Sequence, residues 1–211
     1  MATHKNDARS RKGQIGLLIL RAKTTQGKLR TVDYAELSSL NISQEGTPLR
    51  PIVSSIHAPT TGISKMLDTL IRPLFDKYVA QTSFLDGVHL IRRLETYVSL
   101  GLLKPTTLFC TFDIIDLYTM LPQEESIAIL KKFLIQHGHS HVRGITIDTI
   151  ELLAQAVLTE NVFVYNGKYF RQILGGAMGS PFTLTLANIF MWNWEQTLVE
   201  HQKNTNELYG R

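Results

Sequence analysis

Two short segments of this chain carry residue types that could do metal-dependent chemistry. The first, Thr111–Tyr118 (TFDIIDLY), delivers the carboxylates of Asp113 and Asp116 from a β-branched, apolar stretch. The second, Gly175–Pro181 (GGAMGSP), is a glycine-rich turn that opens another apolar stretch. Nucleotidyl transfer by two metal ions needs carboxylates that hold both cations about 4 Å apart. The two segments therefore indicate part of a nucleotidyl-transfer site.

Asp113 is the candidate for the ligand that both cations would share. An aspartate at the end of a buried strand is costly without a partner, and a bound cation would remove that cost. Two alternatives stay open: Asp113 caps the following turn, or it pairs with a nearby lysine. Asp116 follows three residues later and could contact the metal or the triphosphate. It is equally well explained as an aspartate that stabilises the turn.

Two further side chains could contact a nucleotide. Tyr118 follows Asp113 at a distance where an aromatic ring can close over a sugar pocket, although a core tyrosine fits the position equally well. Arg50 precedes Pro51 in a rigid extended segment. That setting suits a guanidinium that reaches a triphosphate bidentately, or an ordinary surface charge.

The glycine-rich turn has a backbone role and a capping role. Ser180 is a candidate N-cap for the helix that Pro181 begins. Glycine lets the backbone approach a bound nucleotide or template closely. The glycines concerned are Gly175, Gly176 and Gly179.

The elements that must position these residues follow from proline, glycine and the spacing of apolar side chains. Residues 48–56 read as an extended strand entered through prolines. Apolar positions at helical spacing follow over 63–78, where Pro73 is expected to kink or break the helix. A further helix fits 84–100 and ends at Gly101.

A second strand and a helix surround the acidic segment. Residues 108–115 are predicted to form an apolar strand in which Cys110 is a buried thiol. Pro122 is well placed in the first turn of a helix that ends near Gln136. That helix has acidic residues in its first turn and basic ones in its last, as the macrodipole favours: Glu124, Glu125, Lys131 and Lys132.

A helix, a hairpin and a long final helix complete the pattern. Asp148 is expected to cap a helix over 149–160. Two apolar strands within 162–171 flank Asn166-Gly167, the strongest short-range signal for a β-hairpin. A last helix fits Pro181 to about Val199. Three alternate histidines, His137, His139 and His141, suit solvent exposure better than metal ligation because no acidic or cysteine partner lies beside them.

Composition excludes several classes of protein. The 211 residues are 44% apolar, enough for a buried core, and the net charge of +4 with a pI near 9.2 is mildly basic. One cysteine excludes a disulfide framework and a cysteine-rich zinc site. No apolar run reaches the roughly 18 residues that span a membrane. We therefore expect an intracellular protein that does not enter a membrane.

Taken in order, four segments resemble the reverse-transcriptase domain of Penelope-like retroelements. The resemblance covers roughly residues 47–211 and leaves 1–46 as a basic, poorly ordered or unmatched lead. Both the order and the spacing of the segments match. The segments are Leu49–Ser54, Phe112–Thr119, Tyr165–Gln172 and Gly176–Phe190.

The resemblance implies an α+β, right-hand polymerase fold with the fingers and part of the palm, incomplete at the C-terminus. Asp113 would be the catalytic metal ligand, with the backbone carbonyl of Ile114 as a second ligand for Mg²⁺. Tyr118 would be the sugar gate, and Arg50 a triphosphate contact from the fingers. The remaining nucleotide-binding positions would be Asp116, Gly179, Ser180 and Pro181.

Such enzymes copy RNA into DNA, so the implied partners are an RNA template, a DNA primer and a deoxynucleoside triphosphate, with the nucleus as the expected location. Two departures stand out. The second carboxylate motif, Tyr-X-Asp-Asp, does not occur in this chain, so we expect a reverse-transcriptase-like domain that is inactive as this fragment. In the family a Thr-His-Lys element normally lies just before the Arg-Pro-Ile strand. Here Thr3-His4-Lys5 is separated from that strand by about forty residues that match no part of the family. We therefore hypothesise that 6–45 are an insertion or a mis-spliced segment.

An alternative from another class is a non-catalytic nucleic-acid-binding module derived from a retroelement. Its affinity would fall steeply with salt, because binding to phosphates releases counterions. The basic residues that would contact phosphates are Arg50, Lys65, Arg72, Arg92 and Arg93.

Overall fold

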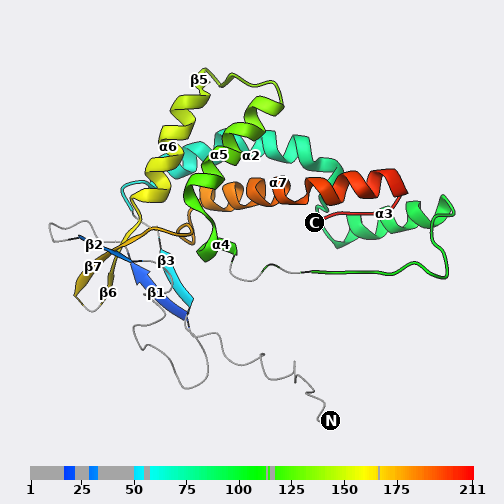
Figure 1. Cartoon of the computed structure of the whole chain (residues 1–211), viewed down its shortest axis with the longest axis horizontal. Coiled ribbons are helices and arrows are strands. Elements are labelled where there is room, and N and C mark those ends of the chain that lie inside the picture. The colour runs from blue at the N-terminus through cyan, green and yellow to red at the C-terminus, as the bar shows by residue number, and fades with distance from the viewer. Residues whose placement is uncertain are drawn as a thin grey trace, which may run out of the picture.

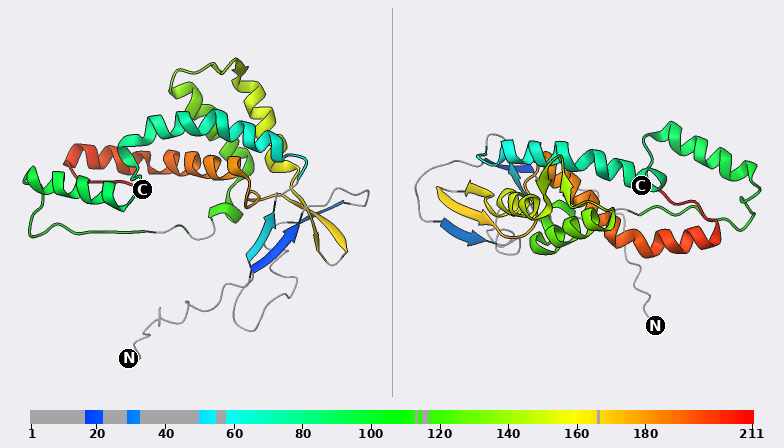
Figure 2. Two further views of the ribbon diagram at one scale, coloured as in Figure 1. Left: turned by 180° about the vertical axis from the view of Figure 1, so that it is seen from behind. Right: turned by 90° about the horizontal axis from the view of Figure 1, so that it is seen from above.

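The computed structural model describes residues 17–21, 29–32, 50–54, 58–112, 114, 117–165 and 167–211. Helices dominate these residues and the sheets are small, so the α+β class is confirmed at that level. The sheets lie at one end of a helical body and α3 (Gly87–Ser99) lies toward the other (Figures 1 and 2). No helix among these residues has the length and apolar content needed to cross a membrane.

Four helices form the core: α2 (Thr61–Val79), α5 (Gln123–Gln136), α6 (Ile147–Thr159) and α7 (Pro181–Thr205). Helix α7 packs against α2 and α5, and α6 packs against α2 and α5 (Figure 1). Each helix contributes apolar side chains to one cluster, as expected for amphipathic helices. Its members include Leu67, Ile71, Phe75, Leu130, Phe133, Leu134, Ile150, Ala154, Leu158, Phe182, Leu186 and Ile189.

Helix α2 runs without a break through Pro73, so of the two expected effects, a kink or a break, the break does not occur. Proline removes one backbone hydrogen bond and crowds the preceding turn. Burial on both sides of Pro73 outweighs that cost, since Leu70 and Ile71 precede it and Phe75 and Val79 follow it, all in the core.

The hairpin around Gly167 forms as the sequence predicts. Strand β6 (Val162–Tyr165) pairs antiparallel with β7 (Lys168–Gln172), and Tyr165 lies opposite Lys168. Gly167 has a φ of 71°, the left-handed conformation that a type I′ turn requires. A second, smaller hairpin joins β4 (His141–Val142) to β5 (Ile145–Thr146).

Two strands come from residues 1–46, the segment that the resemblance to the polymerase family does not cover. Strand β1 (Leu17–Arg21) pairs parallel with β3 (Arg50–Ser54), and β2 (Leu29–Val32) pairs parallel with β7. The strand expected around residues 48–56 is thus present as β3. Residues from 1–46 therefore take part in both larger sheets.

The strand expected over 108–115 does not form in its described part. Residues 108–112 have no regular secondary structure, and Leu108 and Phe109 are 84% and 73% exposed. Cys110 is exposed, so the expected buried thiol was also wrong. A strand needs a neighbour to accept its backbone hydrogen bonds, and none of the described strands lies beside these residues. Phe112 instead contacts Trp194 of α7, with ring centroids 6.1 Å apart.

Helix α3 forms within the expected range but begins later, where Asp86 caps the amide of His89 (2.7 Å). The short 3₁₀ helix η1 (Ala80–Thr82) connects α2 toward it. Gly101, with a φ of 69°, follows the end of α3 as predicted. None of the residues of α3 is fully buried.

Three further helix boundaries correct the sequence reading. Pro122 is the N-cap of α5 rather than a residue of its first turn, and the basic pair at 131–132 lies before its last turn. Thr146, not Asp148, caps α6 through the amide of Thr149. Asp148 binds Lys131 instead (2.9 Å). Helix α7 extends beyond Val199 to Thr205.

Two of the three histidines join an aromatic cluster rather than solvent. The His137 ring lies 4.0 Å from the Tyr78 ring and 4.5 Å from that of Phe133. His139 Nε2 lies 2.9 Å from the Tyr78 hydroxyl. His141 alone is exposed. Stacking on neighbouring rings gives these side chains a structural role.

Candidate functional site

The structure places the sequence-predicted site residues unevenly. Asp113 and Asp116 lie outside the described residues, and Arg50 is described only through the backbone of β3. Ile114 is 37% exposed. Tyr118 belongs to the short helix α4 (Leu117–Met120). The last three, Gly179, Ser180 and Pro181, form the entry to α7.

Backbone hydrogen bonds join α4 directly to the glycine-rich turn. The amide of Gly176 donates to the carbonyl of Tyr118, and the amide of Gly175 donates to the carbonyl of Leu121, both at 2.8 Å. The residues that follow the acidic segment and those that precede the Gly-Ser-Pro entry are therefore adjacent. The motifs in the sequence predict that these two segments share a site.

The first two glycines of the turn are explained by this packing. A Cβ on Gly175 would lie 2.5 Å from the carbonyl oxygen of Tyr118, and its φ is 77°. A Cβ on Gly176 would lie 2.5 Å from Thr183 Cγ2. Gly179 is different because it is exposed and has a φ of 83°. Only Gly179 thus presents its backbone at the surface, where a ligand could approach it.

Ser180 caps α7 as the sequence predicts. Its Oγ accepts from the amide of Thr183 (3.3 Å) and lies 2.8 Å from Ser64 Oγ of α2. Ser64 Oγ also accepts from the amide of Phe182 (3.2 Å). Both hydroxyls are buried. The start of α7 is therefore fixed to α2, and the Ser180 hydroxyl is engaged in the cap.

The sequence left two roles open for Tyr118, a ring that closes over a sugar pocket and a core tyrosine, and its surroundings are compatible with both. Its half-buried ring packs against the helical core, and its carbonyl holds the glycine-rich turn. Burial raises the pKa of its hydroxyl, while the positive charge of Arg72 acts in the opposite direction. The phenol is therefore protonated at neutral pH and can only act as a neutral hydrogen-bond partner or a steric wall.

Gln123, a residue for which the sequence indicated no role, hydrogen-bonds the glycine-rich turn. Its buried amide nitrogen donates to the carbonyls of Gly175 (2.9 Å), Leu158 (3.3 Å) and Gln172 (3.4 Å). These carbonyls come from the turn, α6 and β7. One polar residue directly after a proline gives no sequence signal for such a role.

Two of the proposed phosphate-binding arginines make internal contacts. Arg72 pairs with Asp68 (2.8 Å), which also accepts from the Thr185 hydroxyl. Arg93 donates to the carbonyl of Tyr209 (3.5 Å). Lys65 and Arg92 are exposed. Of the five basic candidates, these last two are the most accessible among the described side chains.

The described residues offer no group of three histidine, cysteine or acidic side chains that could hold a metal ion. The expectation of Mg²⁺ therefore depends on Asp113 and Asp116, which lie outside those residues. Ile114, whose backbone carbonyl is the other proposed ligand, is an exposed residue.

A buried ionic network fixes the C-terminal residues to α7. The Tyr209 hydroxyl donates to Glu195 Oε2 (2.6 Å), and Arg211 Nη1 lies 3.2 Å from Glu195 Oε1. Burial raises the pKa of Glu195, and the Tyr209 hydrogen bond and the charge of Arg211 oppose that rise. Burial together with the Glu195 carboxylate raises the pKa of Tyr209.

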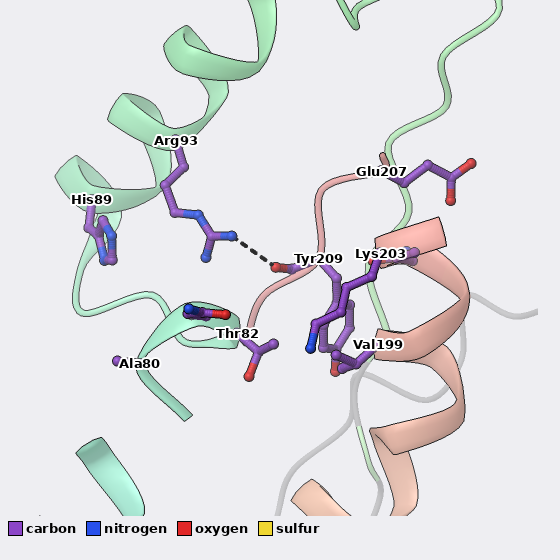
Figure 3. A pocket seen from close by; sticks show the side chains of 10 residues that line it. Ala80, Thr82, His89, Arg93, Val199, Lys203, Glu207 and Tyr209 are labelled. Atoms are coloured by element: carbon purple, nitrogen blue, oxygen red, sulfur yellow. Dashed lines mark hydrogen bonds between the residues drawn. The ribbon is translucent and has the colours of Figure 1, made fainter. Parts of the chain in front are cut away.

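A separate pocket of about 450 Å³ opens between η1, α3 and the end of α7 (Figure 3). Its walls combine basic, polar and apolar side chains. No sequence motif pointed to it, since its lining residues come from two distant regions of the chain, 80–93 and 199–209: Ala80, Gln81, Thr82, His89, Arg93, Val199, Gln202, Lys203, Glu207 and Tyr209.

Comparisons with known proteins give no relative for this chain. No family model matches it, and no curated protein and no solved structure shows significant similarity.

Proposed function

We propose that the chain is a reverse-transcriptase-like unit, related by ancestry to RNA-directed DNA polymerases, that retains fingers and part of a palm. One observation carries the proposal. The carbonyls of Tyr118 and Leu121 accept hydrogen bonds from the amides of Gly176 and Gly175. This contact sets the segment after Asp113 beside the Gly-Ser-Pro entry to α7, the two motifs that a polymerase site must combine.

In this proposal Mg²⁺, when bound, supplies charge stabilisation for a transferring nucleotidyl group. Asp113 and the Ile114 carbonyl would hold the cation, and Asp116 and Arg50 would contact the triphosphate. Tyr118 would wall the sugar pocket. The surface backbone at Gly179, together with Ser180 and Pro181, would position the template and the incoming deoxynucleotide. RNA, a DNA primer and a deoxynucleoside triphosphate are the corresponding partners.

We further propose that this 211-residue polypeptide does not extend primers by itself. Two divalent cations repel each other, and the single acidic segment at 113–116 cannot balance both. The polypeptide is expected to yield no product in a primer-extension assay on an RNA template with Mg²⁺. Extension by the wild type that Asp113→Ala abolishes would contradict this part of the proposal.

Binding of a deoxynucleoside triphosphate with Mg²⁺, measured by calorimetry, tests the site itself. Asp113→Asn should weaken binding about tenfold or more, since it removes the charged ligand. Asp148→Asn is the matched control, because Asp148 is exposed and pairs with Lys131 on α5. Equal affinities for wild type and Asp113→Asn would refute the assignment of Asp113.

The accessible basic residues favour a second candidate, a non-catalytic nucleic-acid-binding module. Lys65 lies on α2 and Arg92 on α3, and both are exposed. Fluorescence anisotropy with a labelled RNA–DNA hybrid should then show metal-independent binding that weakens steeply as salt rises. Lys65→Gln combined with Arg92→Gln should reduce that salt slope, whereas Asp113→Asn should leave it unchanged. Binding that requires Mg²⁺ and Asp113 would favour the polymerase-like site instead.

A further inference from the structure

The pocket between η1, α3 and α7 contains a cationic group whose hydrogen bonds are incomplete. Arg93 reaches into it from α3 (Figure 3), and its Nη2 makes only a long bond of 3.5 Å to the Tyr209 carbonyl. Its Nη1 is buried and has no hydrogen-bond partner among the described residues. A buried charged donor without an acceptor is unfavourable. An anion placed against Nη1 would correct this.

Packing holds the guanidinium of Arg93 in place rather than leaving it free to turn to solvent. Its Cζ lies 5.0 Å from the centre of the Phe84 ring, within the range of a cation–π contact. Phe84 is itself fixed, because its amide donates to the carbonyl of Arg211 (2.7 Å). The unsatisfied Nη1 is therefore a preformed donor.

Further donors line the same pocket. Lys203 extends into it from the last turn of α7 (Figure 3). His89 accepts the amide of Leu85 on Nδ1 (3.2 Å), which leaves Nε2 as the ring nitrogen that can donate to a ligand. Glu207 is the acidic residue of the lining, and its carboxylate points away from Arg93. The charge of the lining is therefore positive on the side of Arg93.

The rest of the wall is suited to an organic group. Ala80 and Val199 are apolar, and Tyr209 adds its ring while its hydroxyl is bound to Glu195. A volume of about 450 Å³ falls within the range of small-molecule sites. We infer that this pocket binds a small organic oxyanion, a phosphate monoester or a carboxylate, through Arg93, with Lys203 as a second contact.

Calorimetric or NMR titration of the full chain tests this with phenyl phosphate, benzoate and benzyl alcohol as probes. The wild type should bind at least one of the two anions saturably and bind the alcohol far more weakly. A preference for phenyl phosphate would identify the phosphate ester as the ligand class, and a preference for benzoate the carboxylate. Saturable binding of the alcohol equal to that of the anions would overturn the inference.

Neighbouring arginines on α3 provide a matched pair of variants. Arg93→Gln should weaken anion binding about tenfold or more, and Arg92→Gln, with the same change of charge at an exposed position, should change it less than about twofold. Lys203→Gln, on the exposed side of α7, should weaken binding about threefold and is not expected to disturb folding. Equal losses from Arg92→Gln and Arg93→Gln, or no saturable anion binding by the wild type, would refute the site.

Discussion

At the scale of single residues, the buried side-chain amide of Gln123 stabilises the backbone of the glycine-rich turn in the predicted site. Its Nε2 serves three carbonyls that belong to the glycine-rich turn, α6 and β7. A buried carbonyl that lacks a hydrogen-bond donor is unfavourable. The Leu158 carbonyl also accepts from Asn161 Nδ2 (3.2 Å), so the contacts with Gly175 and Gln172 carry the argument. Gln123 is thus a positioning residue for the turn beside α4.

Replacing Gln123 by alanine should therefore lower the free energy of unfolding by about 2 kcal/mol, the cost of leaving a buried acceptor unsatisfied. Urea denaturation followed by circular dichroism measures the change. Gln136→Ala, at the exposed last residue of the same helix, is the control and should stay within about 0.5 kcal/mol of wild type. Equal effects of the two substitutions would contradict the role assigned to Gln123.

The buried carboxyl of Glu195 makes stability depend on pH. Because burial raises its pKa in the folded protein, the folded state holds this proton more tightly than the unfolded state does. The free energy of unfolding should therefore fall as pH rises from the ordinary glutamate range through the raised pKa. The contribution is favourable on the acidic side of that window and lost above it.

Denaturant titrations at a series of pH values test this. Glu195→Gln removes the titrating group and should flatten the decline, whereas Glu200→Gln, at an exposed position on the same helix, should keep it. A decline of the same size in Glu195→Gln would mean that another group causes the pH dependence.

At the scale of elements, the contact between α4 and the glycine-rich turn is a close approach of two backbones. Gly175 meets two requirements at once, a left-handed φ and the lack of a Cβ against the carbonyl of Tyr118. Gly138 has almost the same φ, 79°, but nothing lies within 4 Å of where its Cβ would be. Comparing substitutions at Gly138 and Gly175 therefore separates the cost of the left-handed backbone conformation from the cost of a steric clash at Cβ.

Gly138→Ala should cost about 1–2 kcal/mol, the penalty of a left-handed conformation for alanine. Gly175→Ala should cost about 1–3 kcal/mol more, because the new methyl group collides with backbone that cannot move aside. Thermal unfolding of both variants measures the difference. Similar losses would show that α4 and the turn are not held as closely as described.

At the scale of the whole molecule, the two larger sheets join sequence regions that motif analysis separated. Strands β1 and β2 lie within the segment 6–45 that was hypothesised to be an insertion, and they pair with β3 and β7. Removing them would leave unpaired strand edges, which lower solubility and protection. Among the side chains that the structure describes, the members of the helical core lie in α2, α5, α6, α7 and their connections, so we expect this core to persist without the segment.

A chain that lacks residues 6–45 should therefore keep slow hydrogen exchange in α5 and α7 and lose protection in β3. Strand β7 should lose less, because it remains paired with β6. Hydrogen exchange measured by mass spectrometry on peptides from these elements reports the protection of the helices and of the strands in one experiment. Unchanged protection in β3 would favour the hypothesis that 6–45 are an insertion or a mis-spliced segment.

The sequence by itself determined the features that depend on local chemistry. The Asn-Gly hairpin, the strand at 50–54, the Ser180 cap and the approximate helices follow from φ preferences, capping and apolar spacing, which act within a few residues. Asp113 and Asp116, the centre of the predicted site, lie outside the described residues, so their role rests on the sequence.

Only the tertiary structure decided the features that depend on distant partners. Helix α2 continues through Pro73, and Leu108 and Phe109 stay exposed because none of the described strands pairs with them. Gln123 hydrogen-bonds the glycine-rich turn. The tertiary structure also assembles the Arg93 pocket from two regions that are far apart in the sequence, 80–93 and 199–209. The physical reason is that burial and strand pairing are set by which segments meet in space, and the local pattern of residues does not specify those neighbours.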